Sequence, residues 1–489
     1  MKKNNLSLVS PEYLGIPSES INRFLDQVQE KQLPMHSFLL LRHGKIAAEG
    51  YWPPFDENRF HRMYSVSKSF TSVAVGMMVD EGKLRLDDKV ASFFPEYLPE
   101  NPHPCTLEAT VEHLLMMATQ NETNSYSFES KDFVETFFTD AKPKHKPGTI
   151  FHYDTAGTTV LCAIVEKLAG KPMLEYMRPV LDEIGFSEDA TCIETPEGRS
   201  WTGSGILCTP RDLARFALLC LNKGAWNGKQ LVSQAYMEAA TTPRINNAVA
   251  RTSCGNAYGY GYQFWGMMNG GFGCFGMGSQ FAFCMPEKDA IMVTTADTQM
   301  LSGAEDLLVD AFHQILGSMQ DEALPEDTAS VAQLQNRLAN LSIPLPEGAN
   351  TSSRSMLFAG KTYEFEANRS GFKWMRFTWQ DDQCVIQYEN PTGTHQITLG
   401  MGHYAAQQFP EKYSGKRIGT LDRHYQCIAA GAWVDDHVLM ATLYSVDDHL
   451  GTLRMQFAFT ESELCVFMTK TAEFFFNEYT GFLTGYAKA

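Results

Sequence analysis

The chain has 489 residues, of which 44% are hydrophobic and 20% are charged. This length exceeds what one hydrophobic core usually holds, so we expect two domains in an ordinary globular protein. The formal net charge of −17 argues against nucleic acid or an anionic membrane as the main partner, because such surfaces select for basic patches.

The N-terminal residues and the cysteines indicate the compartment. Residues 1–12 lack the apolar stretch of a signal peptide, and no segment approaches the roughly 18 apolar residues of a membrane span. The 11 cysteines are dispersed and none forms C-x-x-C. This pattern favours reduced, buried thiols over a disulfide framework or a zinc site. We therefore expect a cytoplasmic protein.

Residues 1–318 are predicted to form an α+β domain. Its first elements are a strand hairpin at residues 36–52 and an apolar, buried helix that follows Lys68 and ends near Gly82. A mostly helical stretch then precedes two strands and a closing helix. The further expected elements are helices at 111–117, 159–168, 210–221 and 304–316, and strands at 281–285 and 291–295. Distant segments would thus complete one sheet.

The remaining residues change in character. Residues 319–354 are predicted to be a linker, with a short helix at 331–341 and a proline and glycine cluster at 344–348. Apolar and polar residues alternate beyond it, as in the run 453–459, which is the signature of strands with one apolar face. We expect residues 355–489 to form an all-β barrel or sandwich.

Ser65 and Lys68 place a hydroxyl and an amine three residues apart at the head of the predicted apolar helix. Three residues make nearly one helical turn, so both side chains would face the same way. A serine hydroxyl is a poor nucleophile unless a neighbouring base or cation assists it, and a lysine can supply either. The same spacing also recurs by chance at serine-rich helix starts with an ordinary surface lysine.

A second candidate is Tyr153, which follows a proline-glycine turn and precedes a helix of small residues. A side chain at a loop-to-helix junction can be held rigidly and still be reached by substrate. Close to Lys68, such a tyrosine could have its pKa lowered enough to shuttle protons; the alternative is a core aromatic. His61 and His152 could also lie near this site, although a structural role is the more common one for either.

Residues 271–276 match G-x-G-x-x-G, the dinucleotide fingerprint. That fingerprint needs a preceding strand and a following helix, whereas here a glycine-rich loop is predicted to lead into a strand that starts at Ser279 or Gln280. The glycines instead indicate a close approach of backbone to a neighbour. The absence of G-x-S-x-G argues against an α/β-hydrolase fold, and neither H-E-x-x-H nor a phosphate-binding loop motif occurs in the sequence.

Together these segments resemble the serine β-lactamase and penicillin-binding-protein superfamily, and most closely its class C β-lactamase-related branch of esterases, amidases and D-peptidases. The resemblance covers about residues 12–318. Ser65 and Lys68 match the first family motif, and residues 153–155 occupy the place of its tyrosine-x-asparagine motif. The resemblance implies an antiparallel sheet flanked by helices plus a helical subdomain, with Ser65, Lys68 and Tyr153 as catalytic residues. Further segments agree in family order: 81–88, 111–115 and 205–213.

Two positions depart from the family pattern. Thr155 replaces the family's asparagine and cannot present an amide. The third family motif, usually a basic residue followed by threonine or glycine and then glycine, is matched by Met277-Gly278-Ser279. In true β-lactamases and D-peptidases the basic residue helps to hold a substrate carboxylate. Its loss therefore argues against penicillins and D-Ala-D-Ala ends as favoured substrates.

The resemblance also implies the rest of the site. The backbone N–H groups of Ser65 and Gln280 would form the oxyanion hole. No metal or cofactor is required. The C-terminal domain resembles, in architecture and position, the lipocalin-like barrels that follow this hydrolase domain in some relatives. The expected substrate-binding residues are Thr155, Met277, Gly278, Ser279, Tyr260 and Trp265, with core packing as the alternative role for the aromatic ones.

The implied function is acyl transfer through a covalent intermediate on Ser65, with an ester or amide bond of a small molecule or short peptide as the substrate. Antibiotic hydrolysis is not expected. The open alternatives are an acyltransferase and a catalytically weak ligand-binding or sensory relative of penicillin-binding proteins. Neither nucleic acid nor membrane is an expected partner, and self-association into a homo-oligomer is left open.

Overall fold

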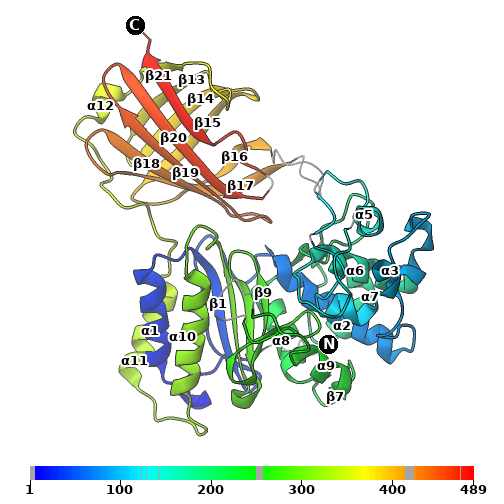
Figure 1. The fold of residues 1–489 in the computed structure, drawn as a ribbon. Helices are drawn as coiled ribbons and strands as arrows, with labels where there is room; N and C mark the ends of the chain where they lie inside the picture. The colour runs from blue at the N-terminus through cyan, green and yellow to red at the C-terminus, as the bar shows by residue number, and fades with distance from the viewer. Residues whose placement is uncertain are drawn as a thin grey trace. The chain divides into compact units, whose positions relative to one another are not determined.

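The computed structural model describes residues 6–122, 124–127, 129–140, 142–248, 257–412, 423–473 and 475–488. The chain forms two compact units, Met1–Ile343 and Pro344–Ala489 (Figure 1). The boundary falls within the proline-rich part of the predicted linker, so the short helix of that segment belongs to the first unit. No helix in the described ranges is long and apolar enough to cross a membrane.

A six-stranded antiparallel sheet forms the centre of the first unit. Its strand order is β2-β1-β11-β10-β9-β8, so strands from both ends of the unit pair in its middle. The predicted completion of one sheet by distant segments is confirmed. The strands are β1 (Met35–Arg42), β2 (Lys45–Tyr51), β8 (Trp265–Gly266), β9 (Phe272–Gly276), β10 (Gln280–Met285) and β11 (Ala290–Ala296).

Helices cover both faces of this sheet. All eight residues of β1 and all seven of β11 are buried, as expected for strands that are covered on both sides. On one face lie α1 (Ser18–Glu30), α10 (Ala304–Ser318) and α11 (Thr328–Ala339), of which α1 contacts the other two (Figure 1). On the other face α8 (Pro210–Leu221) packs against β1, β10 and β11. A capping box formed by Thr209 and Asp212 begins α8.

The helical part of the first unit is built around α2 (Ser67–Asp80) and α6 (Thr155–Ala169), which contact each other. Every residue of α2 from Ser67 to Met78 is buried, which is typical of a helix packed on all sides. The other elements are α3 (Pro104–Glu108), α4 (Val111–Leu115), α5 (Phe133–Thr139), α7 (Met173–Leu181), α9 (Gln234–Thr241), β3 (His61–Arg62), β4 (Thr191–Cys192), β5 (Ile206–Cys208), β6 (Ala225–Trp226) and β7 (Lys229–Gln230).

The second unit is a closed barrel, as the resemblance implied. Its strands follow the order β15-β14-β13-β12-β21-β20-β19-β18-β17, and a parallel pairing of β15 with β17 at Gly400 and Met401 closes a 9-strand ring. β16 pairs with β17 beside the ring. The elements are α12 (Ser355–Phe358), β12 (Thr362–Phe365), β13 (Trp374–Gln380), β14 (Gln383–Asn390), β15 (Gly393–Met401), β16 (Ala405–Lys412), β17 (His424–Trp433), β18 (Val438–Ser445), β19 (Gly451–Phe459), β20 (Glu463–Ala472) and β21 (Gly481–Ala487).

The glycine-rich segment before β10 differs from its prediction. Residues 271–276 are not a loop, because Phe272–Gly276 pairs with β10 as strand β9. The predicted close approach of backbone is present: a Cβ at Gly276 would collide with the main-chain oxygen of Met63. The strand therefore runs directly beside the chain that leads to Ser65. The other elements predicted in the first unit are confirmed, with helix and strand ends shifted by a few residues.

Candidate active site

The candidate nucleophile Ser65 lies in a 3-10 turn, Tyr64–Val66, that runs directly into α2. Tyr64 has a φ of 47°, a left-handed backbone conformation that is costly for a bulky residue. Such strain clusters at functional sites, where a particular backbone direction is held by the surrounding structure. Ser65 is half-buried, whereas Tyr64 and Val66 on either side are fully buried.

Lys68 lies one helical turn after Ser65 and is 1% exposed. Its Nζ donates a hydrogen bond to Ser65 Oγ at 3.1 Å and another to the main-chain oxygen of Gly203. The same nitrogen lies 5.0 Å from the centre of the Tyr153 ring. The predicted contact of hydroxyl and amine is therefore present, and the burial of Lys68 rules out the alternative of an ordinary surface lysine.

Tyr153 lies immediately before α6, whose N-cap is Asp154. Asp154 is buried, and its Oδ2 accepts a hydrogen bond from the Thr119 hydroxyl at 2.9 Å, which fixes this junction. The Tyr153 ring stacks on Trp265, with ring centroids 5.4 Å apart and an interplanar angle of 22°. Its hydroxyl shares a hydrogen bond with Ser65. Tyr153 is thus close to both Ser65 and Lys68.

The surroundings of Tyr153 shift its pKa in the direction opposite to the one expected from the sequence. Burial of the phenol raises the pKa above its usual value of about 10, and the hydrogen bond with Ser65 offsets only part of this effect. The expected lowering of the Tyr153 pKa is therefore wrong. The raised pKa favours the neutral phenol, which can donate a proton or a hydrogen bond.

The turn between β9 and β10 carries the residues that match the third family motif. Both strands contact the Tyr64–Val66 turn. Ser279 has a φ of 71°, and its Oγ lies 2.6 Å from Thr298 Oγ1. The Gln280 side chain donates from Nε2 to the Met277 main-chain oxygen at 3.0 Å. The polar side chains of the turn are thus engaged within the core, and half-buried Met277 adds no charge to it.

The other predicted binding residues lie around Tyr153 and Gly203. Trp265, which stacks on Tyr153, is itself supported edge-on by Tyr260, with ring centroids 4.8 Å apart. Tyr260 is 1% exposed, so it packs behind Trp265. A Cβ added at Gly203 would lie 2.6 Å from Thr155 Cγ2. The Thr155 methyl group therefore packs against the residue whose carbonyl binds Lys68.

The structure assigns His61 to the core of the unit. His61 is 4% exposed, and its ring centroid lies 5.4 Å from that of His36 and 5.1 Å from that of Phe55. Its Nδ1 lies 3.1 Å from the Arg59 main-chain oxygen. Burial lowers the pKa of His61 to about 4 and that of His36 well below its usual value. His152 is half-buried beside Tyr153.

Two groups at this site were not found from the sequence. The Gly203 carbonyl that binds Lys68 is a main-chain atom, and a glycine carries no side chain that would mark it. Arg62, three residues before Ser65, is 1% exposed, and its guanidinium lies over the rings of Tyr64 and Trp201. A lone arginine ahead of an apolar helix was the available signal.

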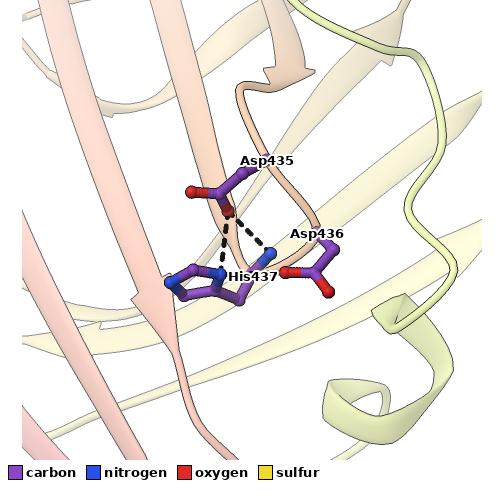
Figure 2. A group of neighbouring side chains, drawn as sticks. All are labelled: Asp435, Asp436 and His437. Atoms are coloured by element: carbon purple, nitrogen blue, oxygen red, sulfur yellow. Dashed lines mark hydrogen bonds and ion pairs between the residues drawn. The ribbon is translucent and has the colours of Figure 1, made fainter.

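One group of side chains in the second unit has the composition of a metal site. Asp435, Asp436 and His437 lie in the exposed turn between β17 and β18 (Figure 2). Asp435 Oδ1 accepts hydrogen bonds from the main-chain N–H groups of His437 at 2.8 Å and Val438 at 2.7 Å. These bonds are those of an Asx turn and account for the arrangement. The described ranges of the chain hold no second cluster of three such groups.

Comparison with known proteins agrees with this fold. The sequence matches the Beta-lactamase family over residues 21–311, more than half of the chain. The chain belongs to this family. Like the family, it falls within the serine hydrolase superfamily. It is 26% identical over 279 residues to the 6-aminohexanoate-dimer hydrolase of Paenarthrobacter ureafaciens, an alignment that covers 53% of this chain and 71% of that protein.

Two solved structures share the fold of this beta-lactamase family member. A penicillin-binding protein homologue from Caulobacter crescentus has a TM-score of 0.51 and 17% identity, covering 64% of this chain and 99% of that chain. EstCE1, described as a hydrolase with promiscuous acyltransferase activity, has a TM-score of 0.50 and 17% identity, covering 60% of this chain and 98% of that chain. At these identities the likeness extends to the fold alone.

Proposed function

We propose that this beta-lactamase family member is a hydrolase that cleaves an ester or amide bond through an acyl-enzyme on Ser65. The observation that carries the proposal is the hydrogen bond of 3.1 Å between Lys68 Nζ and Ser65 Oγ. A catalytic serine needs a base within hydrogen-bond reach, and the base needs a third group to orient it. The Gly203 carbonyl is that third group for Lys68.

In the first step, Lys68 in its neutral form takes the Ser65 proton while Oγ attacks the substrate carbonyl carbon. Tyr153, kept protonated by burial, gives its proton to the leaving oxygen or nitrogen and regains one from Lys68. The bond to the leaving group breaks and the acyl group stays on Ser65. In the second step a water molecule attacks the acyl carbon and Lys68 takes the water proton. The bond between the acyl carbon and Ser65 Oγ then breaks, Lys68 returns the proton to Oγ, and the carboxylic acid product leaves.

The proposed oxyanion hole consists of the main-chain N–H groups of Ser65 and Gln280. Its support is the contact of β9 and β10 with the nucleophile turn. The Gln280 side chain also bonds to the Met277 oxygen at 3.0 Å and the Ala296 oxygen at 2.7 Å, which fixes the turn that bears its N–H. Donors held in advance stabilise a developing oxyanion without reorganising during the reaction.

The proposed substrate is uncharged where it meets Met277. The family resemblance implies that a basic residue at this position would hold a substrate carboxylate. In this turn Ser279 does not replace that charge, because its hydroxyl is hydrogen-bonded to that of Thr298. The relative named 6-aminohexanoate-dimer hydrolase makes short amide-containing compounds the first class to test, with short acyl esters beside them.

The nucleophile is tested by replacing Ser65 with alanine. We expect Ser65→Ala to abolish both hydrolysis of p-nitrophenyl butyrate and labelling by a fluorophosphonate probe. Ser72→Ala is the matched control, because Ser72 is buried in the same helix and bonds to Tyr236. Persistent labelling of Ser65→Ala would overturn the assignment.

The time course of the wild type separates hydrolysis from the alternatives. A burst of p-nitrophenol followed by steady release supports a hydrolase that turns over. A burst with no further release would instead identify a sensory protein that is acylated once. Faster release with an added alcohol, and ester as the product, would identify an acyltransferase.

A further inference from the structure

Arg62 is a buried cation next to the candidate active site. It ends β3, is 1% exposed, and donates from Nε to the Ser204 main-chain oxygen at 2.8 Å and from Nη2 to Ser204 Oγ at 2.9 Å. Two donors of one planar guanidinium thus hold two oxygens of one residue, a geometry that lysine cannot reproduce. Such a fork fixes the position of Ser204 relative to β3.

The faces of the guanidinium contact two aromatic rings. Its carbon lies 4.2 Å from the centre of the Tyr64 ring and 4.9 Å from that of Trp201. Arginine favours such contacts with aromatic faces, and they are stronger when shielded from water. Both rings are buried, at 1% and 2% exposure for Tyr64 and Trp201. Arg62 therefore joins the turn before Ser65 to the segment that contains Trp201 and Ser204.

The two segments that Arg62 joins each hold a group of the proposed mechanism in place. Tyr64 has a φ of 47°, and the backbone angles of this residue set the direction of the Ser65 N–H. At the other end, Gly203 lies between Trp201 and Ser204, and its carbonyl accepts the hydrogen bond of Lys68. Arg62 thus contacts Tyr64, the residue before the nucleophile, and both Trp201 and Ser204, which lie on either side of the Lys68 acceptor in the chain.

We infer that Arg62 is a positioning residue that sets the distance and direction between Lys68 and Ser65, by bracing the strained Tyr64 turn against the segment of Gly203. This inference rests on the proposed function of Ser65 and Lys68. Arg62 acts through these groups and does not itself touch the substrate. A displacement of about 1 Å in such a site can cost on the order of 100-fold in rate.

The test compares Arg62→Lys with a matched control, Arg42→Lys, by steady-state hydrolysis of p-nitrophenyl butyrate across pH. Arg42 is also a buried arginine, 3% exposed, and donates to the main-chain oxygens of Leu14, Lys288 and Gln320, away from the site. Thermal unfolding reports the folding of both variants. Arg62→Lys keeps the charge but loses the fork.

For Arg62→Lys we expect kcat to fall by about 100-fold with a smaller change in KM. The acidic limb of the kcat profile should move to lower pH, because a displaced Gly203 oxygen no longer stabilises the charged form of Lys68. Arg42→Lys should leave kcat and the profile unchanged. A folded Arg62→Lys with the kcat and pH profile of Arg42→Lys would overturn the inference, as would a loss confined to KM.

Ser204→Ala decides the question if Arg62→Lys does not fold, because it removes one acceptor and keeps the arginine. It should give a smaller fall in kcat and a shift of the acidic limb in the same direction; an unchanged profile would overturn the inference. The proposed function is separable: if Ser65→Ala abolishes turnover while these variants behave as the control, the function stands and the role of Arg62 does not.

Discussion

Lys68 Nζ lies 5.0 Å from the centre of the Tyr153 ring and within hydrogen-bond reach of Ser65, so amine, phenol and hydroxyl form one cluster. In the proposed mechanism, Lys68 and Tyr153 have different roles in proton transfer. Burial raises the pKa of Tyr153, which leaves Lys68 as the base and makes the phenol the proton donor to the leaving group.

Replacing Tyr153 with phenylalanine tests this division. We expect Tyr153→Phe to lower kcat by about 100-fold or more, because general acid catalysis contributes on the order of 10²- to 10⁴-fold. The loss should be larger for an anilide than for a p-nitrophenyl ester, since the amine leaving group needs the proton more. Because the pKa of Tyr153 is raised, the wild type should show no decline from tyrosine ionisation up to pH 10. A decline between pH 8 and 9 that disappears in Tyr153→Phe would contradict the assignment.

A cation at position 277 should change the substrate preference. Half-buried Met277 lies in the turn that carries Gln280, and Met277→Lys would supply a charged donor for a substrate carboxylate. We expect the ratio of kcat/KM for p-nitrophenyl hemiglutarate to that for p-nitrophenyl butyrate to rise about tenfold, equivalent to about 1.4 kcal/mol. Met277→Leu is the size-matched control and should leave the ratio unchanged. An equal ratio in both variants would show that position 277 does not meet the substrate.

His36 and His61 should make the first unit sensitive to acid. The pKa of His61 is lowered by burial to about 4 in the folded protein, against about 6.5 when unfolded. Above pH 6.5 both states are neutral and the pair has no effect on stability. As the pH falls from 6.5 towards 4, the unfolded state takes up a proton that the folded state cannot, so the free energy of unfolding decreases by about 3 kcal/mol for His61 alone.

Urea unfolding at pH 7 and pH 4.5 measures this loss. His61→Leu keeps an apolar side chain and removes the titrating group, so it should lose less stability than the wild type between these two pH values. His437→Gln, in the exposed turn of the second unit, is the control and should follow the wild type. If the free energy of unfolding falls by the same amount between pH 7 and pH 4.5 in the wild type and in His61→Leu, His61 does not cause the acid sensitivity.

Residues 1–343 should keep the reactive serine without the barrel. The groups that surround Ser65 in the structure, among them Lys68, Tyr153 and Gly203, lie in the first unit. We expect the truncated chain to unfold cooperatively and to be labelled by a fluorophosphonate at the rate of the full chain. A folded but unlabelled product would assign the barrel a part in the site. A change in the mass measured in solution would assign it a part in assembly.

The sequence predicted those parts of the site that depend on local geometry. Ser65 and Lys68 meet because residues three apart on a helix share a face, and the proline-glycine turn correctly placed Tyr153 before a helix. The direction of the Tyr153 pKa shift could not be predicted, because it depends on burial by residues such as Trp265, which reach the ring only through the fold. The Gly203 carbonyl leaves no mark in the sequence for the same reason.

In the fold, too, local features could be predicted from the sequence and long-range contacts could not. Alternating residues predicted the barrel strands, yet its closure depends on a short parallel pairing of β15 with β17 that no local pattern encodes. The glycines of β9 predict a loop, because glycine is disfavoured in strands. In this strand Gly276 lies where a side chain would strike the Met63 oxygen, so the close contact with the nucleophile segment outweighs strand propensity.

The placement of β1 beside β11 has a consequence for folding during synthesis on the ribosome. Ser37 in β1 and Thr295 in β11 bond across 258 residues of sequence. At translation rates of about 5 to 20 residues per second, β1 waits roughly 13 to 50 s for its neighbour to emerge. During that interval an eight-residue strand, buried throughout in the finished unit, lacks the partner that covers its edge. The segment with Ser65 emerges in the same interval, so a nascent chain has its nucleophile well before the sheet that surrounds it.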